Sequence, residues 1–175
     1  MTPSQTPPVP TVLQEALTQL QSEYEADVVS ALQPILLANW QDQRIQSYLD
    51  ATGAGLLDYV RRVAQNYVRD APRVASLHNG NASGAWEQLA PRLQQWVYQY
   101  LRNEAVDPAD LPDAAAWATR QAAHFILQEH VPYDICFDTW ALFQTRRACQ
   151  AQRGRLEVRE CGGEFVNKRE NPWPS

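Results

Sequence analysis

Apolar side chains recur every three or four residues along most of this chain, which places them on one face of successive α-helices. The stripes run over residues 13–35, 56–67, 86–101 and 111–126, and a last helix is predicted from Asp138 or Thr139 to about Gln152. With 45% hydrophobic residues and six tryptophans, the 175-residue chain can form a real core. The pattern predicts an all-α fold, a compact bundle of about five helices.

Short local patterns predict where these helices begin and end. Thr11-Val-Leu-Gln14 is a capping box, so Thr11 is predicted to cap the first helix. Pro34 is predicted to kink or end that helix, and the second is predicted to stop near Asp70-Ala-Pro72. Asp107 is an acidic residue followed by a proline, which predicts the N-cap of the fourth stripe.

Composition divides the chain into four predicted parts. Prolines gather at both ends, which is typical of tails. Residues 156–160 and 164–167 flank Cys161-Gly-Gly163 and suit a short C-terminal hairpin, although two strands alone are marginal in water. The parts are a flexible tail (1–10), an N-terminal helical region (11–80), a helical domain (84–155) and a tail or small hairpin (156–175).

Several features of the sequence indicate a cytoplasmic protein. No run reaches the roughly 18 apolar residues that a membrane helix needs. The N-terminal residues MTPSQTPPVP lack the basic and apolar regions of a secretory signal. Three cysteines, at positions 136, 149 and 161, are odd in number and lack CxxC spacing, which favours reduced thiols. We therefore expect neither a membrane partner nor secretion.

Motifs of catalysis are missing from the sequence. It contains no GxGxxG, Walker, GxSxG or HExxH pattern. His124 and His130 are six residues apart, which does not place them on one helical face as zinc ligands require. Asp107 and Asp110 are explained by helix capping. The sequence predicts a protein without enzymatic activity, cofactor or metal.

The strongest binding signal lies between Pro132 and Arg155. This stretch combines four aromatic residues with four arginines: Tyr133, Phe137, Trp140, Phe143, Arg146, Arg147, Arg153 and Arg155. The chain as a whole carries a net charge of -5, yet residues 145–175 carry +3 while residues 1–144 carry -8. Bases stack on exposed aromatic rings and guanidinium groups pair with phosphates, so this combination suits single-stranded nucleic acid. It also suits a helix whose aromatics form a core stripe and whose arginines are solvated.

The order and spacing of motifs from Trp86 to Arg155 resemble the second conserved region of the sigma-70 family, in its extracytoplasmic-function form. The matching segments are Trp86-Glu-Gln-Leu-Ala-Pro-Arg-Leu93, Asp110-Leu-Pro-Asp113 and Phe137-Asp-Thr-Trp140-Ala141, followed by the arginines. Departures include Ala114 and Ala141, where the family usually has Glu and Leu. The family's helix-turn-helix that reads the -35 element has no counterpart after Arg155.

This resemblance implies a division of labour within the chain. The helix after Asp107 would dock on the clamp helices of core RNA polymerase through Asp110, Leu111 and Asp113. The promoter -10 element, as a single strand, would contact Tyr133, Phe137, Trp140, Arg146, Arg147, Arg153 and Arg155. A separate protein regulator is compatible with this arrangement.

Two other interpretations remain open. The chain could be a helical protein-interaction module that keeps a sigma-like fold without DNA binding, which its acidic first 144 residues suit. It could also be an unrelated helical bundle with a basic tail. The exposed face of the last helix separates these interpretations, because DNA binding requires its arginines and an aromatic ring on one surface.

Overall fold

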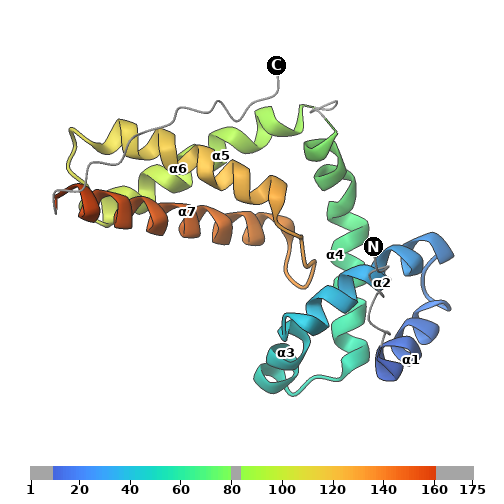
Figure 1. Cartoon of the computed structure of the whole chain (residues 1–175). Helices are drawn as coiled ribbons and strands as arrows, with labels where there is room; N and C mark the ends of the chain where they lie inside the picture. Colours follow the sequence, from blue (N-terminus) through green and yellow to red (C-terminus); the bar gives the residue numbers. More distant parts are fainter. Residues whose placement is uncertain (1–9, 80–83, 161–175) are drawn as a thin grey trace, which may run out of the picture. The chain divides into compact units, whose positions relative to one another are not determined.

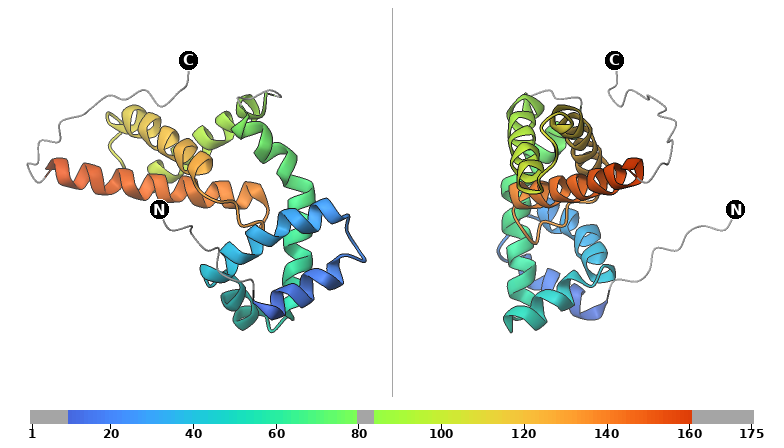
Figure 2. Two further views of the ribbon diagram at one scale, coloured as in Figure 1. Left: turned by 45° about the vertical axis from the view of Figure 1, so that its right-hand side comes forward. Right: turned by 90° about the vertical axis from the view of Figure 1, so that its left-hand side faces the viewer.

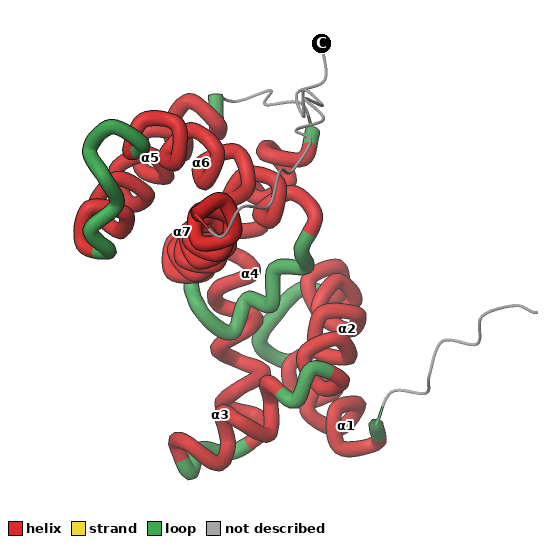
Figure 3. Tube along the Cα trace, turned by 60° about the vertical axis from the view of Figure 1, so that its left-hand side comes forward, coloured by secondary structure: helices red, strands yellow, loops and turns green. Residues whose placement is uncertain are grey.

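A computed structural model of the chain describes residues 10–79 and 84–160, with side chains through Gly154. In these ranges the chain forms seven helices and no strand (Figure 1; Figure 3 colours helices and loops). They are α1 (Thr11–Leu20), α2 (Ala26–Gln41), α3 (Arg44–Thr52), α4 (Leu56–His78), α5 (Ala85–Asn103), α6 (Leu111–Gln128) and α7 (Phe137–Glu160). The all-α prediction is confirmed, and five helices was too low a count. No described helix is both long and apolar enough to cross a bilayer.

The described residues form two compact units. Unit 1 comprises the chain up to Pro72 together with residues 131–137, and unit 2 comprises residues 73–130 and the chain from Asp138 onward. The boundary falls inside α4 and again at the start of α7. The domain predicted over residues 84–155 includes residues 131–137, whereas in the structure these residues group with the N-terminal helices.

Unit 1 has its core between the apolar faces of α1 to α4. The predicted stripes supply most of its buried side chains, which include Leu13, Leu17, Leu20, Leu32, Ile35, Tyr59, Val60 and Val63. The first stripe is broken at residues 21–25, so it forms α1 and α2 instead of one helix. Gly53, at φ 67°, ends α3 in the left-handed conformation that glycine adopts at low cost.

Unit 2 is built around α5, α6 and α7, which lie side by side in both views of Figure 2. One cluster of buried residues joins the three helices and consists of Val97, Leu101, Ala114, Ala115, Ala118 and Cys149. The small alanines of α6 allow close approach of its neighbours, which is how an alanine-rich stripe can serve as a core face. Burial raises the pKa of the Cys149 thiol to about 11, so this cysteine stays neutral at pH 7.

Three prolines lie inside helices instead of ending them. α2 continues beyond Pro34 to Gln41, and α4 continues beyond Pro72 to His78, so the predicted stop near Pro72 is wrong. Pro91 lies inside α5. All three rings are on exposed positions, where water can bond the backbone carbonyl that loses its amide partner.

Two predicted helix starts are displaced. Thr11 is the first residue of α1, Pro10 occupies the N-cap, and no side chain caps this end, so the capping-box prediction is wrong. α6 starts at Leu111 with Asp110 as N-cap. The Asp107 carboxylate instead accepts a 2.8 Å bond from the Ala109 amide, in a turn just before the helix.

The C-terminal hairpin is also corrected. Residues 156–160, predicted as its first strand, continue α7 as helix. The second predicted strand lies outside the described residues.

Candidate nucleic-acid interface

α7 presents one buried and one exposed face along its described length. The buried face consists of Trp140, Ala141, Thr145, Ala148, Cys149 and Gln152. The exposed face, here called the α7 stripe, consists of Phe143, Arg146, Arg147, Gln150 and Arg153. Spacings of three and four residues place the members of each set on one side of the helix. Three of the predicted arginines, Arg146, Arg147 and Arg153, therefore share a surface.

Phe143 is the aromatic residue of this surface. Its side chain is 48% exposed, and Arg146 and Arg147 follow three and four residues later, one helical turn away. A ring with an open face beside guanidinium groups can stack a base while the cations meet phosphate. The sequence motif contained Phe143, but the residues expected to contact the strand were its neighbours.

Two of the three arginines of the α7 stripe already bind carboxylates. Arg147 Nη1 lies 2.8 Å from Glu129 Oε1, and its guanidinium also lies 4.4 Å from the centre of the Phe125 ring. Arg153 Nη1 lies 2.8 Å from Glu104 Oε2. Exposed ion pairs of this kind contribute only about 0–1 kcal/mol, so phosphate can compete with the carboxylates. No ion pair is formed by Arg146 in the described part of the chain.

The three aromatics predicted to contact the strand are buried. Tyr133, Phe137 and Trp140 are only 6%, 1% and 4% exposed. A base cannot stack on a ring whose faces are covered by protein. In the observed conformation these three rings are closed to a base, and their contact with a strand stays a prediction. The side chain of Arg155 lies outside the described residues.

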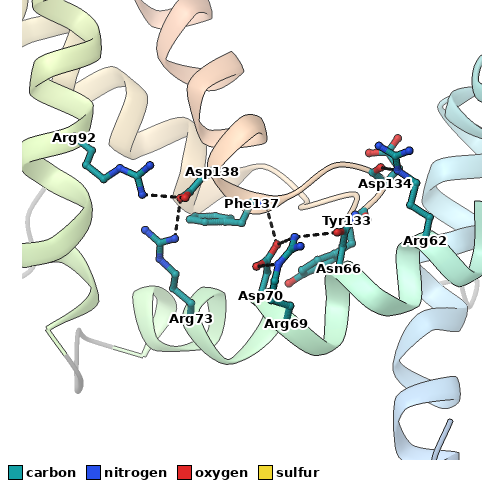
Figure 4. A network of polar contacts seen from close by, with 10 residues as sticks. All are labelled: Arg62, Asn66, Arg69, Asp70, Arg73, Arg92, Tyr133, Asp134, Phe137 and Asp138. Atoms are coloured by element: carbon teal, nitrogen blue, oxygen red, sulfur yellow. Dashed lines mark hydrogen bonds and ion pairs between the residues drawn. The ribbon is translucent and has the colours of Figure 1, made fainter.

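The loop that carries two of these aromatics is fixed by side chains of unit 1. Three consecutive backbone carbonyls accept hydrogen bonds: Pro132 from Asn39 (2.8 Å), Tyr133 from Asn66 (2.7 Å) and Asp134 from Arg62 (2.7 Å). Figure 4 shows two of these donors reaching the loop from α4. A loop has no ladder of its own, so its buried carbonyls need such partners. Residues 131–137 are called the returning segment below.

The Asp134 carboxylate is the centre of the returning segment. Arg44 donates to both of its oxygens at 2.8 Å, and the Tyr59 hydroxyl lies 3.4 Å from Oδ2. Hydrogen bonding to Asp134 raises the pKa of Arg44. Burial, and then the Asp134 charge, raise the pKa of Tyr59. The four residues Asn39, Arg44, Arg62 and Asn66 are called the anchor residues.

Tyr133 adopts an unusual backbone conformation within this segment. Its φ is 55°, in the left-handed region, which costs a residue other than glycine about 1 kcal/mol. The ring lies edge to face on Tyr67, with 5.3 Å between centroids. Burial raises the Tyr133 pKa to about 12, with the charges of Tyr67 and Asp70 adding to it. The surroundings therefore impose a backbone geometry that the residue does not prefer.

Asp138, in the first turn of α7, accepts hydrogen bonds from two arginines of unit 2. Arg73 and Arg92 donate to its two oxygens at 2.8 and 2.9 Å (Figure 4). Burial raises the pKa of Asp138, but the hydrogen bonds from Arg73 and Arg92 outweigh burial and hold the pKa below its usual value. The charge lies in the first turn of the helix, where the macrodipole also favours an anion.

We predict a pH dependence from this carboxylate. Because the folded pKa of Asp138 is depressed, its stabilisation is present above the unfolded pKa of about 4 and is lost as pH falls through the lower folded value. Asp138→Asn should therefore be less stable than the wild type at pH 6, and the difference should shrink towards pH 3. Urea denaturation at both pH values measures this, and a constant difference would contradict it.

The predicted polymerase-binding residues lie at the start of α6. Asp110 and Asp113 are exposed, at the N-cap and in the first turn. Leu111 is half-buried and packs against the unit 2 cluster. The two carboxylates are thus free to meet a partner, while Leu111 contributes to the protein's own core.

Sequence reasoning missed the anchor residues, although two of them left a signal. Asn39 and Asn66 occupy buried positions on the apolar faces of α2 and α4. A polar amide at a core position needs a partner, and the Nδ2 group of each of these amides donates to the returning segment. No pattern in the sequence says which loop that partner comes from.

In the described residues no group of three histidine, cysteine or acidic side chains is placed to hold a metal ion. A scan against protein-family models, a search of curated proteins and a search of solved structures each found no match.

Proposed function

We propose that this chain is a sigma-like, non-enzymatic transcription protein that binds single-stranded DNA of the promoter -10 region on the α7 stripe. In this proposal it docks on core RNA polymerase through Asp110, Asp113 and the half-buried Leu111. The observation that supports DNA binding is the exposed stripe itself, where Phe143 and Arg146 lie one turn apart with open surfaces. The proposal also rests on the motif order described for residues 86–155.

Electrostatics support a weak, salt-sensitive interaction. Arg146 is available directly, whereas Arg147 must exchange Glu129 for phosphate and Arg153 must exchange Glu104. Each arginine that meets a phosphate releases counterions, so affinity falls as salt rises. An acidic chain can bind in this way because the local field near the strand is set by the nearest charges.

A double variant tests the arginines. Arg146→Ala/Arg147→Ala should bind a fluorescein-labelled single strand more weakly than the wild type, because two phosphate contacts are lost. The slope of log affinity against log salt should become shallower by about 1.4, since each contact to a single strand contributes about 0.7. Fluorescence anisotropy between 50 and 200 mM salt measures both quantities. Phe143→Ala should lower affinity roughly 5- to 100-fold by removing one base-stacking platform.

Matched controls separate the α7 stripe from general charge and surface effects. Arg102 is an exposed arginine of α5, and Arg102→Ala removes one positive charge elsewhere in unit 2, half of the charge that the double variant removes. Tyr98 is an exposed aromatic of α5, 42% exposed, so Tyr98→Ala is the partner of Phe143→Ala. Equal slopes for the double variant and Arg102→Ala would contradict the proposal.

The second candidate is a helical protein-interaction module without DNA binding. The burial of Tyr133, Phe137 and Trp140 favours it, as do the carboxylates that neutralise Arg147 and Arg153. Co-elution with core RNA polymerase, followed by addition of the labelled strand, separates the candidates. Co-elution without strand binding supports the interaction module, and co-elution with strand binding supports the sigma-like protein.

A further inference from the structure

We propose that the N-terminal helices of unit 1 restrain strand binding by holding the returning segment closed, and that a single strand binds fully only when the segment is released. This inference rests on the proposed function and concerns its regulation. The returning segment runs directly into α7 and carries two of the buried aromatics, Tyr133 and Phe137.

The contacts that hold the segment are suited to a reversible closure. Three of the anchor residues donate to successive carbonyls, and Arg44 donates to the Asp134 carboxylate. The Phe137 amide donates to Asp70 Oδ2 at 2.9 Å. Water can replace each of these partners once the segment is released, so every hydrogen bond contributes only modestly to the closed state. Residues 131–136 of the segment belong to no helix or strand, so these side-chain hydrogen bonds take the place of a regular backbone ladder there.

The backbone conformation of Tyr133 favours release of the segment. Its left-handed φ of 55° is maintained by the contacts around it, and release allows the residue to return to a preferred conformation. Exposure of the Tyr133 and Phe137 rings opposes release, because both are buried in the closed state. A strand whose bases stack on the released rings removes that penalty, which is the differential affinity that a population shift requires.

A pair of isosteric variants on neighbouring positions of α4 tests the restraint in the full chain. Asn66→Asp keeps the size of the side chain and the oxygen that accepts from Arg69, but removes the donor to the Tyr133 carbonyl. Gln65→Glu makes the same change of charge at an exposed position. Asn39→Ala, on α2, is a second opening variant, because it removes the donor to the Pro132 carbonyl.

The expected result is tighter binding from the opening variants. Asn66→Asp should bind a labelled single strand about tenfold more tightly than Gln65→Glu, despite their equal added negative charge, because the competent state becomes more populated. Asn39→Ala should also bind more tightly than the wild type. Hydrogen exchange of the peptide that contains the Phe137 amide should be faster in both opening variants than in Gln65→Glu.

Each other outcome overturns part of the proposal. Faster exchange with unchanged affinity would show that the segment does not restrain binding. Unchanged exchange in both opening variants would show that the anchor residues do not hold the segment, and would equally reject the inference. If affinity falls in Arg146→Ala/Arg147→Ala but does not rise in Asn66→Asp, the inference fails while the proposed function stands. If no variant binds a strand at 50 mM salt, the proposed function fails and the inference with it.

Discussion

Asp134→Ala is expected to lower the stability of unit 1 by about 2–3 kcal/mol. The substitution removes the acceptor of two Arg44 hydrogen bonds and leaves the hydroxyl of the fully buried Tyr59 without this carboxylate. A buried polar group that loses its partner costs about 1–3 kcal/mol. Arg44 is 36% exposed, so water offsets much of its share and only a small further loss is added. Urea denaturation followed by circular dichroism, with amide exchange to localise the loss, measures the change.

Two further variants define what the carboxylate contributes. Asp134→Asn retains one oxygen acceptor and the side-chain volume, so it should lose less than Asp134→Ala. Asp50 is an exposed acid of α3 that accepts from Gln46, and Asp50→Ala should change stability by less than about 0.5 kcal/mol. If Asp134→Ala were as mild as Asp50→Ala, Asp134 would not be the centre of the segment's contacts.

The largest loss in unit 2 is expected from Leu101→Ala, at about 2–5 kcal/mol. Leu101 is 1% exposed and lies in the cluster where α5, α6 and α7 meet. Three members of that cluster are alanines, which have no torsions with which to fill the cavity left by the leucine side chain. The expected loss therefore lies in the upper part of the range for this substitution. Chemical denaturation monitored by the tryptophans of unit 2 tests it.

Tyr98→Ala is the control for this core substitution. Tyr98 lies on the same helix but is 42% exposed, so truncation removes little buried surface and should cost less than about 1 kcal/mol. Equal losses from the two variants would mean that the cluster does not set the stability of unit 2.

Much of the helical architecture could be predicted from apolar periodicity, and the errors arose where tertiary packing overrides local preference. A proline disfavours continuation of a helix locally. Leu32 and Ile35 lie on either side of Pro34 and are both buried, so their packing favours a continuous α2. Val74 and Leu77 do the same for α4 beyond Pro72. The burial of residues beyond each proline could not be read from the local pattern.

The arginine half of the candidate site could be predicted, but the aromatic half could not. Arg146, Arg147 and Arg153 are exposed because charged groups remain solvated. Trp140 and Phe143 are one turn apart and equally apolar, so periodicity alone does not decide which of them enters the core. The structure buries Trp140 and leaves Phe143 half exposed. The contacts of the returning segment could not be predicted either, because they join residues far apart in the sequence. Asn39 and Pro132, for example, are separated by 93 residues.

That separation has a consequence for how the protein is made. The returning segment is the last piece of unit 1, and residues 73–130 of unit 2 precede it along the chain. During synthesis, Asn39 and Asn66 therefore emerge long before the carbonyls that they bind. Contacts of such high sequence separation form late, because a long loop must close first. Residues 73–130 must therefore be translated before these contacts can form, and residues 1–72 expressed alone would lack the partners of their buried amides.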